Sequence, residues 1–297
     1  MDWVYRKGEL ARAEWDVYLD PTEEKIKGWT HTGMRVATLK ENPLHIPADK
    51  NERLIWPLEG PGLTVKFSNQ SETGSHNLRG RKTVFHGTTD IIYLPINTEA
   101  TISGSGRVVV AQAPAKNSKP VKFIAKDSFP NSIRGAGPES RQIHDFGGVS
   151  ALDADRFIVV EVIVPAGNWS GVPPHKHDQY KPGVESNLEE IYYFELAPER
   201  NTKAPQNYDA KGFFRGYSAD SRPYDITTEV RSGDVVLVPY GWHGPIGTAP
   251  AYDMYFMNVM AGPDPDRSWN VTDEPEHAWI RETWKDKAPD PRLPYRE

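Results

Sequence analysis

The sequence predicts an all-β protein, a sandwich or a barrel built mainly from antiparallel strands. Short apolar runs rich in β-branched and aromatic residues recur along its 297 residues. Turn-forming residues separate these runs, and the chain contains 24 Gly and 26 Pro. The periodicity of long helices is almost absent. Together these observations favour strands joined by turns, with few and short helices.

Each expected strand is an apolar run bounded by Gly, Pro, Asn or Asp. We expect strands over residues 63–67, 91–94, 107–111, 157–164, 235–238 and 254–260. The one short helix that the pattern indicates covers residues 278–285.

A weak internal repeat indicates two copies of one structural unit. Residues 90–95 (DIIYLP) resemble residues 234–239 (DVVLVP), with the same spacing from Asp to Pro. In each copy we expect the Asp in the turn before a strand and the Pro at the end of that strand. The copies then diverge, because the fourth residue after the Pro is Glu99 in the first and His243 in the second.

Composition excludes several classes of function. The formal net charge of −6 and the lack of a basic run argue against nucleic-acid binding. The chain has no cysteine, which excludes disulfides, thiolate metal ligands and a thiol nucleophile. No apolar run approaches the roughly 20 residues of a membrane helix, and the first residues lack the apolar core of a signal peptide. We therefore expect a soluble, cytoplasmic protein without membrane contact.

Two histidines spaced one residue apart, His175 and His177, are the strongest functional signal. Alternate side chains of a strand share a face, so both imidazoles are expected to point the same way and Lys176 to point outward. The preceding Pro173-Pro174 stiffens the entry to this strand. A third histidine, His243, follows an apolar run and a Gly-containing turn. Converging imidazoles and a carboxylate are typical of transition-metal sites, so we predict such a site here.

The fourth ligand is expected to be a carboxylate, but spacing alone leaves its identity open. Glu189 and Glu190 are neighbours and must face opposite sides of a strand, so at most one of them binds. Apolar residues lie on both faces of this run, so strand parity does not choose between them. The acidic candidates are Asp178, Glu185, Glu189 and Glu190.

A chain of this length favours two domains over one. Residues 113–120 (APAKNSKP) have the composition of a connection, and a second loop covers residues 134–138. We place the boundary between them, which gives an N-terminal domain of residues 1–130 and a C-terminal domain of residues 131–297. The first half contains no H-x-H pair, so the metal site is expected only in the C-terminal domain.

These residues resemble the two sequence motifs of the cupin superfamily. The first motif supplies H-x-H and a Glu, here His175, His177 and Glu190. The second is G-x5-P-x-G followed by a His, here residues 233–241 and His243. The loop between the histidine pair and the Glu is longer than usual, and the last His comes one residue early. Both departures indicate a specialised branch.

One branch of the superfamily, the 5-deoxyglucuronate isomerases of myo-inositol catabolism, resembles nearly the whole chain. The similarity lies in residues 173–178 (PPHKHD), 188–193 (LEEIYY) and 258–263 (NVMAGP), and in N-terminal segments within residues 80–95 and 134–144. The related 5-keto-4-deoxyuronate isomerases place their ligand Glu before an aliphatic residue and a Tyr. That pattern carries over to Glu190.

The resemblance implies a bicupin fold: two double-stranded β-helix (jelly-roll) barrels with few short helices. It also implies an aldose–ketose isomerase that converts 5-deoxy-D-glucuronate into 5-dehydro-2-deoxy-D-gluconate. One divalent transition metal, bound by His175, His177, Glu190 and His243, would stabilise the enediolate of this reaction. The reaction needs no redox change, which makes Zn adequate, although Mn, Fe, Ni or Co would suit the same ligands.

The remaining candidates follow from the chemistry of this reaction. A base must remove the C2 proton, and the candidates are Asp178 and Tyr192. The alternative role for Asp178 is that of a turn residue after the strand, and the alternative role for Tyr192 is packing in the barrel core. Arg141 and Arg215 are candidates for the substrate carboxylate, with surface ion pairs as the alternative. Tyr255 and Asn258, on a later strand, are candidates to form hydrogen bonds with sugar hydroxyls. The alternative for Tyr255 is core packing, and the alternative for Asn258 is a turn or cap role.

Two other functions stay open for such a fold. A metal cupin can activate dioxygen as an oxidoreductase or dioxygenase, although the resemblance outside the ligand residues argues against it. The second alternative is a non-enzymatic sugar-binding bicupin. The expected partner is a small-molecule sugar acid, and a homo-oligomer formed through exposed sheet edges is also predicted.

Overall fold

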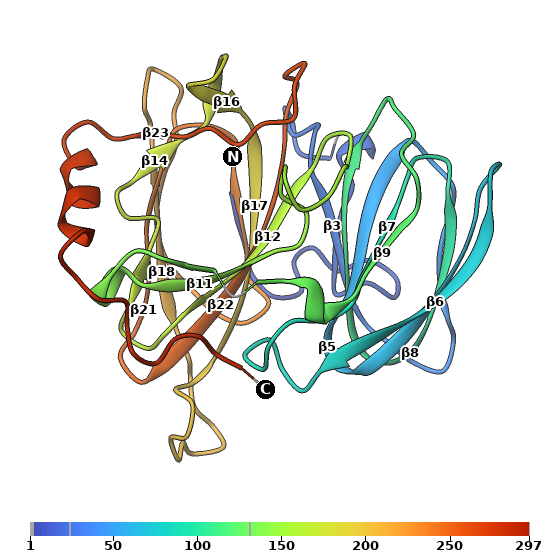
Figure 1. The fold of residues 1–297 in the computed structure, drawn as a ribbon, viewed down its shortest axis with the longest axis horizontal. Coiled ribbons are helices and arrows are strands. Elements are labelled where there is room, and N and C mark those ends of the chain that lie inside the picture. Colours follow the sequence, from blue (N-terminus) through green and yellow to red (C-terminus); the bar gives the residue numbers. More distant parts are fainter. Residues whose placement is uncertain (1–2, 24, 131, 297) are drawn as a thin grey trace.

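The computed structural model describes residues 3–23, 25–130 and 132–296. Two β-barrels lie side by side, the first coloured blue to green and the second mainly yellow to red (Figure 1). The helical segments of the described residues are 3-10 turns, and the longest of them confirms the short helix predicted at residues 278–285. They are η1 (Pro21–Glu23), η2 (Lys126–Ser128), η3 (Gly137–Glu139) and η4 (Ala278–Trp284).

The N-terminal barrel is an eight-stranded antiparallel sheet. Its main path is β2-β3-β8-β5-β7-β9, with β4 paired to β8 and β6 paired to β5. The strands are β2 (Val17–Leu19), β3 (Gly33–Thr38), β4 (Leu44–Ile46), β5 (Asn51–Ser68), β6 (Thr73–Arg81), β7 (Ile91–Leu94), β8 (Glu99–Pro114) and β9 (Lys122–Ile124).

Glycines allow the long strands β5 and β8 to bend. The first half of β5 pairs with β7 and the second half with β6, and the register of β5 against β8 shifts around Gly60. Gly60 and Gly106 have positive φ angles of 114° and 104°, and a Cβ on Gly106 would lie 2.2 Å from the carbonyl oxygen of Glu59. Only glycine permits this conformation and this close approach of the two strands.

The C-terminal barrel consists of two larger sheets and a hairpin. One sheet has the order β1-β20-β17-β22-β12-β11-β10, and the other has the order β19-β18-β21-β14-β23, with β13 paired to β21. The strands of the first sheet are β1 (Val4–Tyr5), β10 (Ser132–Arg134), β11 (Arg141–Asp145), β12 (Ile158–Val164), β17 (Glu189–Pro198), β20 (Val235–Val238) and β22 (Tyr252–Ala261). Those of the second are β13 (Trp169–Ser170), β14 (His175–Lys176), β18 (Gly212–Tyr217), β19 (Asp225–Val230), β21 (Trp242–Thr248) and β23 (Thr272–Asp273), and the hairpin is β15 (Asp178–Lys181) with β16 (Glu185–Asn187).

The internal repeat seen in the sequence is also present in three dimensions. The order β3-β8-β5-β7 of the first barrel matches the order β12-β22-β17-β20 of the second, so the repeat strands β7 and β20 hold equivalent places. By register, Arg53 opposite Leu94 corresponds to Glu190 opposite Val238. Arg53 is fully buried and pairs with Asp49 at 2.5 Å. A buried cation therefore occupies the position in the N-terminal barrel that a carboxylate occupies in the other.

The first strand of the chain belongs to the second barrel. Strand pairing changes from one barrel to the other between β9 and β10, close to the predicted boundary at residue 130. However, β1 pairs with β20, with Val4 opposite Val236, and Arg6 pairs with Asp234 at 2.9 Å. Strand β1 therefore joins the sheet of the C-terminal barrel, although it lies within the N-terminal domain predicted over residues 1–130. The edge of β20 needs a hydrogen-bonding partner, and the start of the chain supplies it.

Strand alternation divides the core into three parts. One apolar cluster fills each barrel, and a third lies between them. On β17, Tyr192 faces the interior of the C-terminal barrel, whereas Ile191 and Tyr193 belong to the cluster between the barrels. Residues on the same face as Tyr192 are thus positioned to line a cavity inside that barrel.

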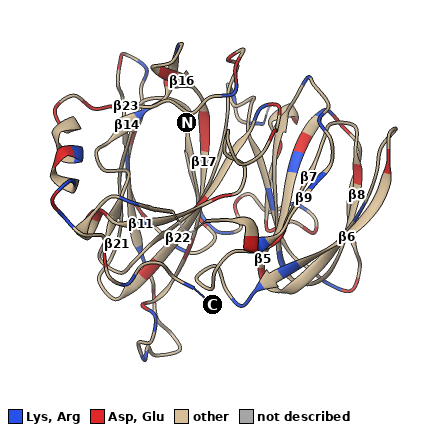
Figure 2. Cartoon of the chain, in the orientation of Figure 1, with Lys and Arg blue, Asp and Glu red and all other residues tan. Residues whose placement is uncertain are grey.

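Charged side chains are spread over both barrels, with acidic and basic residues interspersed (Figure 2). Among the described residues, none of the helices has the length and apolar character needed to cross a membrane.

Candidate metal centre and active-site pocket

The three predicted histidine ligands converge inside the C-terminal barrel. His175 on β14 lies directly opposite His243 on β21, and their ring centroids are 4.4 Å apart. The ring of His177 lies 4.8 Å from that of His243 and 6.1 Å from that of His175. One ring nitrogen from each histidine lies within 4.8 Å of the others, which is close enough for a single ion to contact all three.

Glu190 completes the cluster. Its Oε2 lies 3.1 Å from Nε2 of His177 and 3.2 Å from Nε2 of His243. Burial alone would raise its pKa, but the hydrogen bond with His177 and the electrostatic interactions with both His177 and His243 hold the pKa of Glu190 well below its usual range. The carboxylate is therefore ionised, as a metal ligand must be.

The burial and hydrogen bonding of the imidazoles also fit a metal ion. Burial, reinforced by His243 and His177, lowers the pKa of His175 well below its ordinary value, so this ring is neutral. His177 Nδ1 lies 3.0 Å from the carbonyl oxygen of Leu188, which leaves Nε2 directed at the cluster. His243 Nε2 is buried and has no hydrogen-bond partner of suitable geometry. A buried ring nitrogen that lacks a hydrogen-bond partner and lies beside a carboxylate fits the role of a metal ligand.

Strand parity in the structure separates the two neighbouring glutamates. Glu190 shares the inner face of β17 with Tyr192, whereas Glu189 faces the N-terminal barrel. The carboxylate of Glu189 accepts backbone N–H groups from His31 and Thr32, both at 2.6 Å. Burial raises the pKa of Glu189 to about 7. Glu189 therefore ties the two barrels together and is not part of the histidine cluster.

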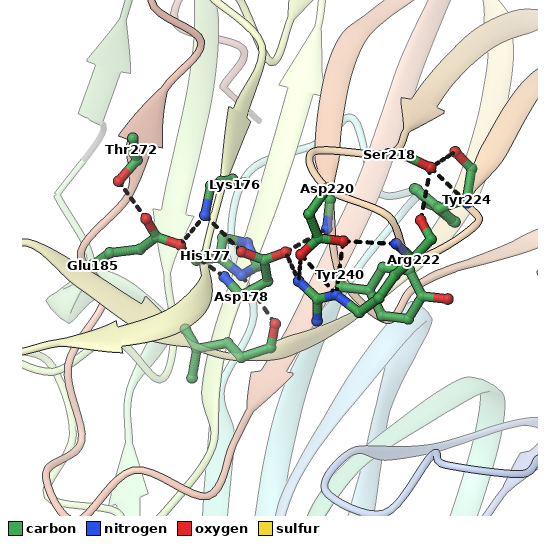
Figure 3. A network of polar contacts seen from close by, with 12 residues as sticks. Lys176, His177, Asp178, Glu185, Ser218, Asp220, Arg222, Tyr224, Tyr240 and Thr272 are labelled. Atoms are coloured by element: carbon green, nitrogen blue, oxygen red, sulfur yellow. Dashed lines mark hydrogen bonds and ion pairs between the residues drawn. The ribbon is translucent and has the colours of Figure 1, made fainter.

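The other two acidic candidates belong to a buried network behind the histidines (Figure 3). Lys176 Nζ lies 2.6 Å from Asp178 Oδ1 and 2.6 Å from Glu185 Oε1. Asp178 Oδ2 pairs with Arg222 at 2.6 Å and accepts the backbone N–H of Gly241 at 3.0 Å. Lys176 points away from the histidine cluster, as expected, but it is buried and ion-paired rather than exposed.

Asp178 is thus not placed to act on a substrate. Both of its carboxylate oxygens have partners, and it is not among the residues that line the cavity beside the histidines. Burial opposes ionisation, but the hydrogen bonds from Lys176 and Gly241 lower the pKa of Asp178 below its ordinary value. A fully partnered carboxylate with a lowered pKa is a weak base.

A pocket of about 410 Å³ opens beside the cluster and brings together some of the predicted residues. His175, Glu190, Tyr192, Asn258 and Arg141 all line it. Tyr192 on β17 lies directly opposite Asn258 on β22. The volume is within the usual range for a small-molecule site.

Two predicted substrate contacts lie outside this pocket. Arg215 on β18 pairs with Asp225 and donates to backbone carbonyls at the surface. Tyr255 donates its hydroxyl to Glu161 at 2.6 Å in the core between the barrels. The alternation of β22 explains this position, because residues 255 and 258 are an odd number apart and face opposite sides. The same parity was available in the sequence.

Sequence reasoning did not find several residues that line the pocket. They come from β10, from the segment after β22 and from η4, which no short motif connects to the ligands: Arg134, Trp269, Arg281 and Trp284. Only the folded chain brings the C-terminal segment to this pocket, and its helical turn η4 is the red coil at the far left of Figure 1.

Comparisons with solved structures agree with the fold. A crystal structure of an IolB-like protein from Salmonella typhimurium LT2 is 31% identical, with a TM-score of 0.80, and the match covers 94% of this chain and 99% of that one. An oxalate decarboxylase from Lactobacillus farciminis is only 10% identical, with a TM-score of 0.59 over 97% of this chain and 96% of that one, and shows the fold alone. These likenesses confirm the predicted bicupin fold.

Sequence comparisons identify the family. A curated relative from Geobacillus kaustophilus (strain HTA426), named 5-deoxy-glucuronate isomerase, is 35% identical over 88% of this chain and 90% of its own. A second of the same name from Geobacillus thermodenitrificans (strain NG80-2) is 39% identical over 86% of this chain and 88% of its own. The family model for KduI/IolB matches residues 3–280. The chain is therefore an enzyme of the KduI/IolB family, and isomerisation is the activity that its named relatives share.

Proposed function

We propose that this enzyme is a metal-dependent aldose–ketose isomerase that converts 5-deoxy-D-glucuronate into 5-dehydro-2-deoxy-D-gluconate in myo-inositol catabolism. The observation that carries the proposal is the convergence of His175, His177, His243 and Glu190 in one cluster beside the pocket, in a chain whose relatives are named for this substrate. Neutral imidazoles and an ionised carboxylate are the donors that a divalent transition metal requires.

The net reaction moves one hydrogen from C2 to C1 and the hydroxyl proton from O2 to O1 of the sugar, through an enediolate. A divalent ion held by the four ligands would supply positive charge beside the two oxygens that change between carbonyl and hydroxyl. Zinc is the proposed metal because no redox step is needed, and the ligand set also suits Mn, Fe, Ni or Co.

Tyr192 is the proposed proton-transfer group. Its hydroxyl shares the inner face of β17 with Glu190, and burial together with the charge of Glu190 raises its pKa well above the ordinary value. Tyr192 therefore stays protonated and is suited to donate to a substrate oxygen, not to start the reaction as a free base. Asn258, opposite Tyr192, lines the pocket with a buried amide and is suited to bond a sugar hydroxyl.

The proposal is tested by assaying metal-stripped protein on 5-deoxy-D-glucuronate with and without added Zn²⁺ or Mn²⁺, with a His243→Ala variant beside it. We expect the ketose product only with metal and only in the unmutated protein. An oxygen electrode in the same cell distinguishes the oxidoreductase alternative, which predicts consumption of dioxygen. Metal-loaded protein that binds the sugar acid without turnover would instead favour a binding protein.

A further inference from the structure

We propose that the end of the pocket formed by Arg134, Arg141, Trp269 and Trp284 is an anion site that holds the carboxylate of the substrate away from the histidine cluster. The identity of the acid rests on the proposed function, whereas the anion site itself rests on the geometry of these four side chains.

Two arginines at this end have no acidic partner. Arg134 on β10 and Arg141 on β11 are directly opposite each other, an arrangement that is unfavourable for like charges. Arg141 donates to the carbonyl oxygen of Glu139 at 3.1 Å, and neither guanidinium forms an ion pair within the part of the chain that the structure describes. The nearby Arg281 differs, because it is paired with Asp273.

The energetics of Arg141 show that this positive charge is not compensated. Burial, then the charges of Arg134 and Arg281, lower the pKa of Arg141 to about 10, against the opposing effect of Glu139. An anion placed between Arg134 and Arg141 would remove the repulsion and provide a bidentate partner for a guanidinium.

Two indole groups add unsatisfied donors to the same end. The Nε1 atoms of Trp269 and Trp284 are buried and lack hydrogen-bond partners. The guanidinium of Arg134 lies 5.3 Å from the ring centre of Trp269, and that of Arg141 lies 5.5 Å from the ring centre of Trp284. A buried N–H without an acceptor is costly, and the oxygens of a carboxylate can accept several such bonds.

The floor of the pocket explains the orientation. It crosses the sheet from Glu190 on β17, past Asn258 on β22 and Val160 and Val162 on β12, to Arg141 on β11. Strands β22 and β12 separate β17, which carries Glu190, from β11, which carries Arg141. The β12 residues that line the pocket between these two polar side chains are the apolar Val160 and Val162. A molecule with hydroxyls at one end, a methylene next and a carboxylate at the other matches this order, and 5-deoxy-D-glucuronate has that structure.

The site is tested by pairing two substrates with two variants. The substrates are 5-deoxy-D-glucuronate and its neutral counterpart 5-deoxy-D-glucose, in which CH₂OH replaces the carboxylate. We expect the unmutated enzyme to prefer the acid by about tenfold to hundredfold in kcat/KM, the range of a charge-assisted bond. Arg141→Gln should lose this preference, because its kcat/KM should fall for the acid and stay unchanged for the neutral sugar. Arg215→Gln, a surface arginine outside the pocket, is the matched control and should keep it.

A binding measurement separates failure of the anion site from failure of the proposed reaction. Calorimetry with D-glucuronate and with D-glucose as probes should show acid-selective binding that Arg141→Gln abolishes. Trp284→Phe, which keeps an aromatic ring beside Arg141 but removes the indole N–H, should weaken it several-fold. Acid-selective binding without turnover would support the anion site and overturn the proposed reaction. Equal loss for both sugars in Arg141→Gln, or no preference for the acid in the unmutated protein, would overturn the anion site.

Discussion

Tyr192 and Tyr193 are neighbours on β17 with opposite surroundings. Tyr192 lines the pocket beside Glu190, whereas the Tyr193 hydroxyl contacts Arg107 and Glu195 on the outer face. We expect Tyr192→Phe to reduce kcat by about 10²- to 10⁴-fold, the usual contribution of a positioned proton-transfer group, with bound metal unchanged. Tyr193→Phe is the control and should retain its kcat. Equal rates for the two variants would remove Tyr192 from the mechanism.

Asp178 is expected to position the ligands and not to take part in the chemistry. One carboxylate oxygen of Asp178 pairs with Lys176, which stands between His175 and His177 in the sequence. The other accepts the backbone N–H of Gly241, two residues before His243. Asp178→Asn should raise the Kd for Zn²⁺ by roughly 10- to 100-fold, as is typical for groups that orient metal ligands. At saturating metal, kcat should stay close to the original value. If Asp178 were the base, kcat would fall while metal affinity held.

Single residues show where sequence reasoning succeeds and where it stops. The H-x-H spacing was sufficient to predict that His175 and His177 share a site, because alternation in a strand is local geometry. The choice between Glu189 and Glu190 was not available from parity alone, since both faces of β17 are covered by protein. Arg141 and Arg215 were equivalent in sequence, and only the fold separates a pocket residue from a surface ion pair.

Strand β1 is the element whose place the sequence did not reveal. Its two residues pair with β20, and Leu237 donates its backbone N–H to the carbonyl of Trp3 at 2.8 Å. A strand of two residues is too short to show an alternation of apolar and polar side chains, so its sequence does not indicate which strand, over 200 positions away, it pairs with. By contrast, β7 and β20 were both predicted with their observed bounds, because each is a continuous apolar run between Asp and Pro.

Removing this strand tests its contribution. Deletion of residues 1–6 leaves the edge of β20 unpaired and takes away the Arg6–Asp234 ion pair. We expect a loss of a few kcal/mol in the free energy of unfolding by urea and an increased tendency to aggregate through the exposed edge. Arg6→Ala, which removes only the half-exposed ion pair, should cost less than about 1 kcal/mol. The same stability for the deletion and Arg6→Ala would mean that β1 pairing contributes nothing.

At the scale of the whole molecule, the two barrels are joined by a buried ion pair. Glu161 on β12 of the C-terminal barrel accepts hydrogen bonds from Arg81 of the N-terminal barrel at 2.7 Å and from Trp56 at 3.0 Å. Tyr255 donates its hydroxyl to the same carboxylate. Tyr255 therefore contributes to this contact between the barrels and not to the substrate pocket. The barrel that holds the histidine cluster therefore packs against the other barrel, in which Arg53 occupies the position equivalent to Glu190.

This ion pair predicts how stability depends on pH. Although burial opposes ionisation, the charge of Arg81 lowers the pKa of Glu161 to about 2, below its ordinary 4.5. The stabilisation is therefore complete above pH 4.5 and is lost as the pH falls towards 2. Glu161→Gln should cost about 3 to 5 kcal/mol at pH 7 and show a flatter decline in acid, measured by urea unfolding at several pH values. Parallel pH profiles for the two proteins would contradict this.

We expect one divalent ion in the C-terminal barrel to be required for isomerase activity. The most direct measurement is a titration of metal-free protein with Zn²⁺, with bound metal determined by mass spectrometry and formation of the ketose followed by NMR. Activity should rise in proportion to bound metal and level off at one ion per chain, and Glu190→Gln should shift the whole curve to higher Zn²⁺ concentrations. Full activity in metal-free protein, or a bound ion without effect on turnover, would contradict it.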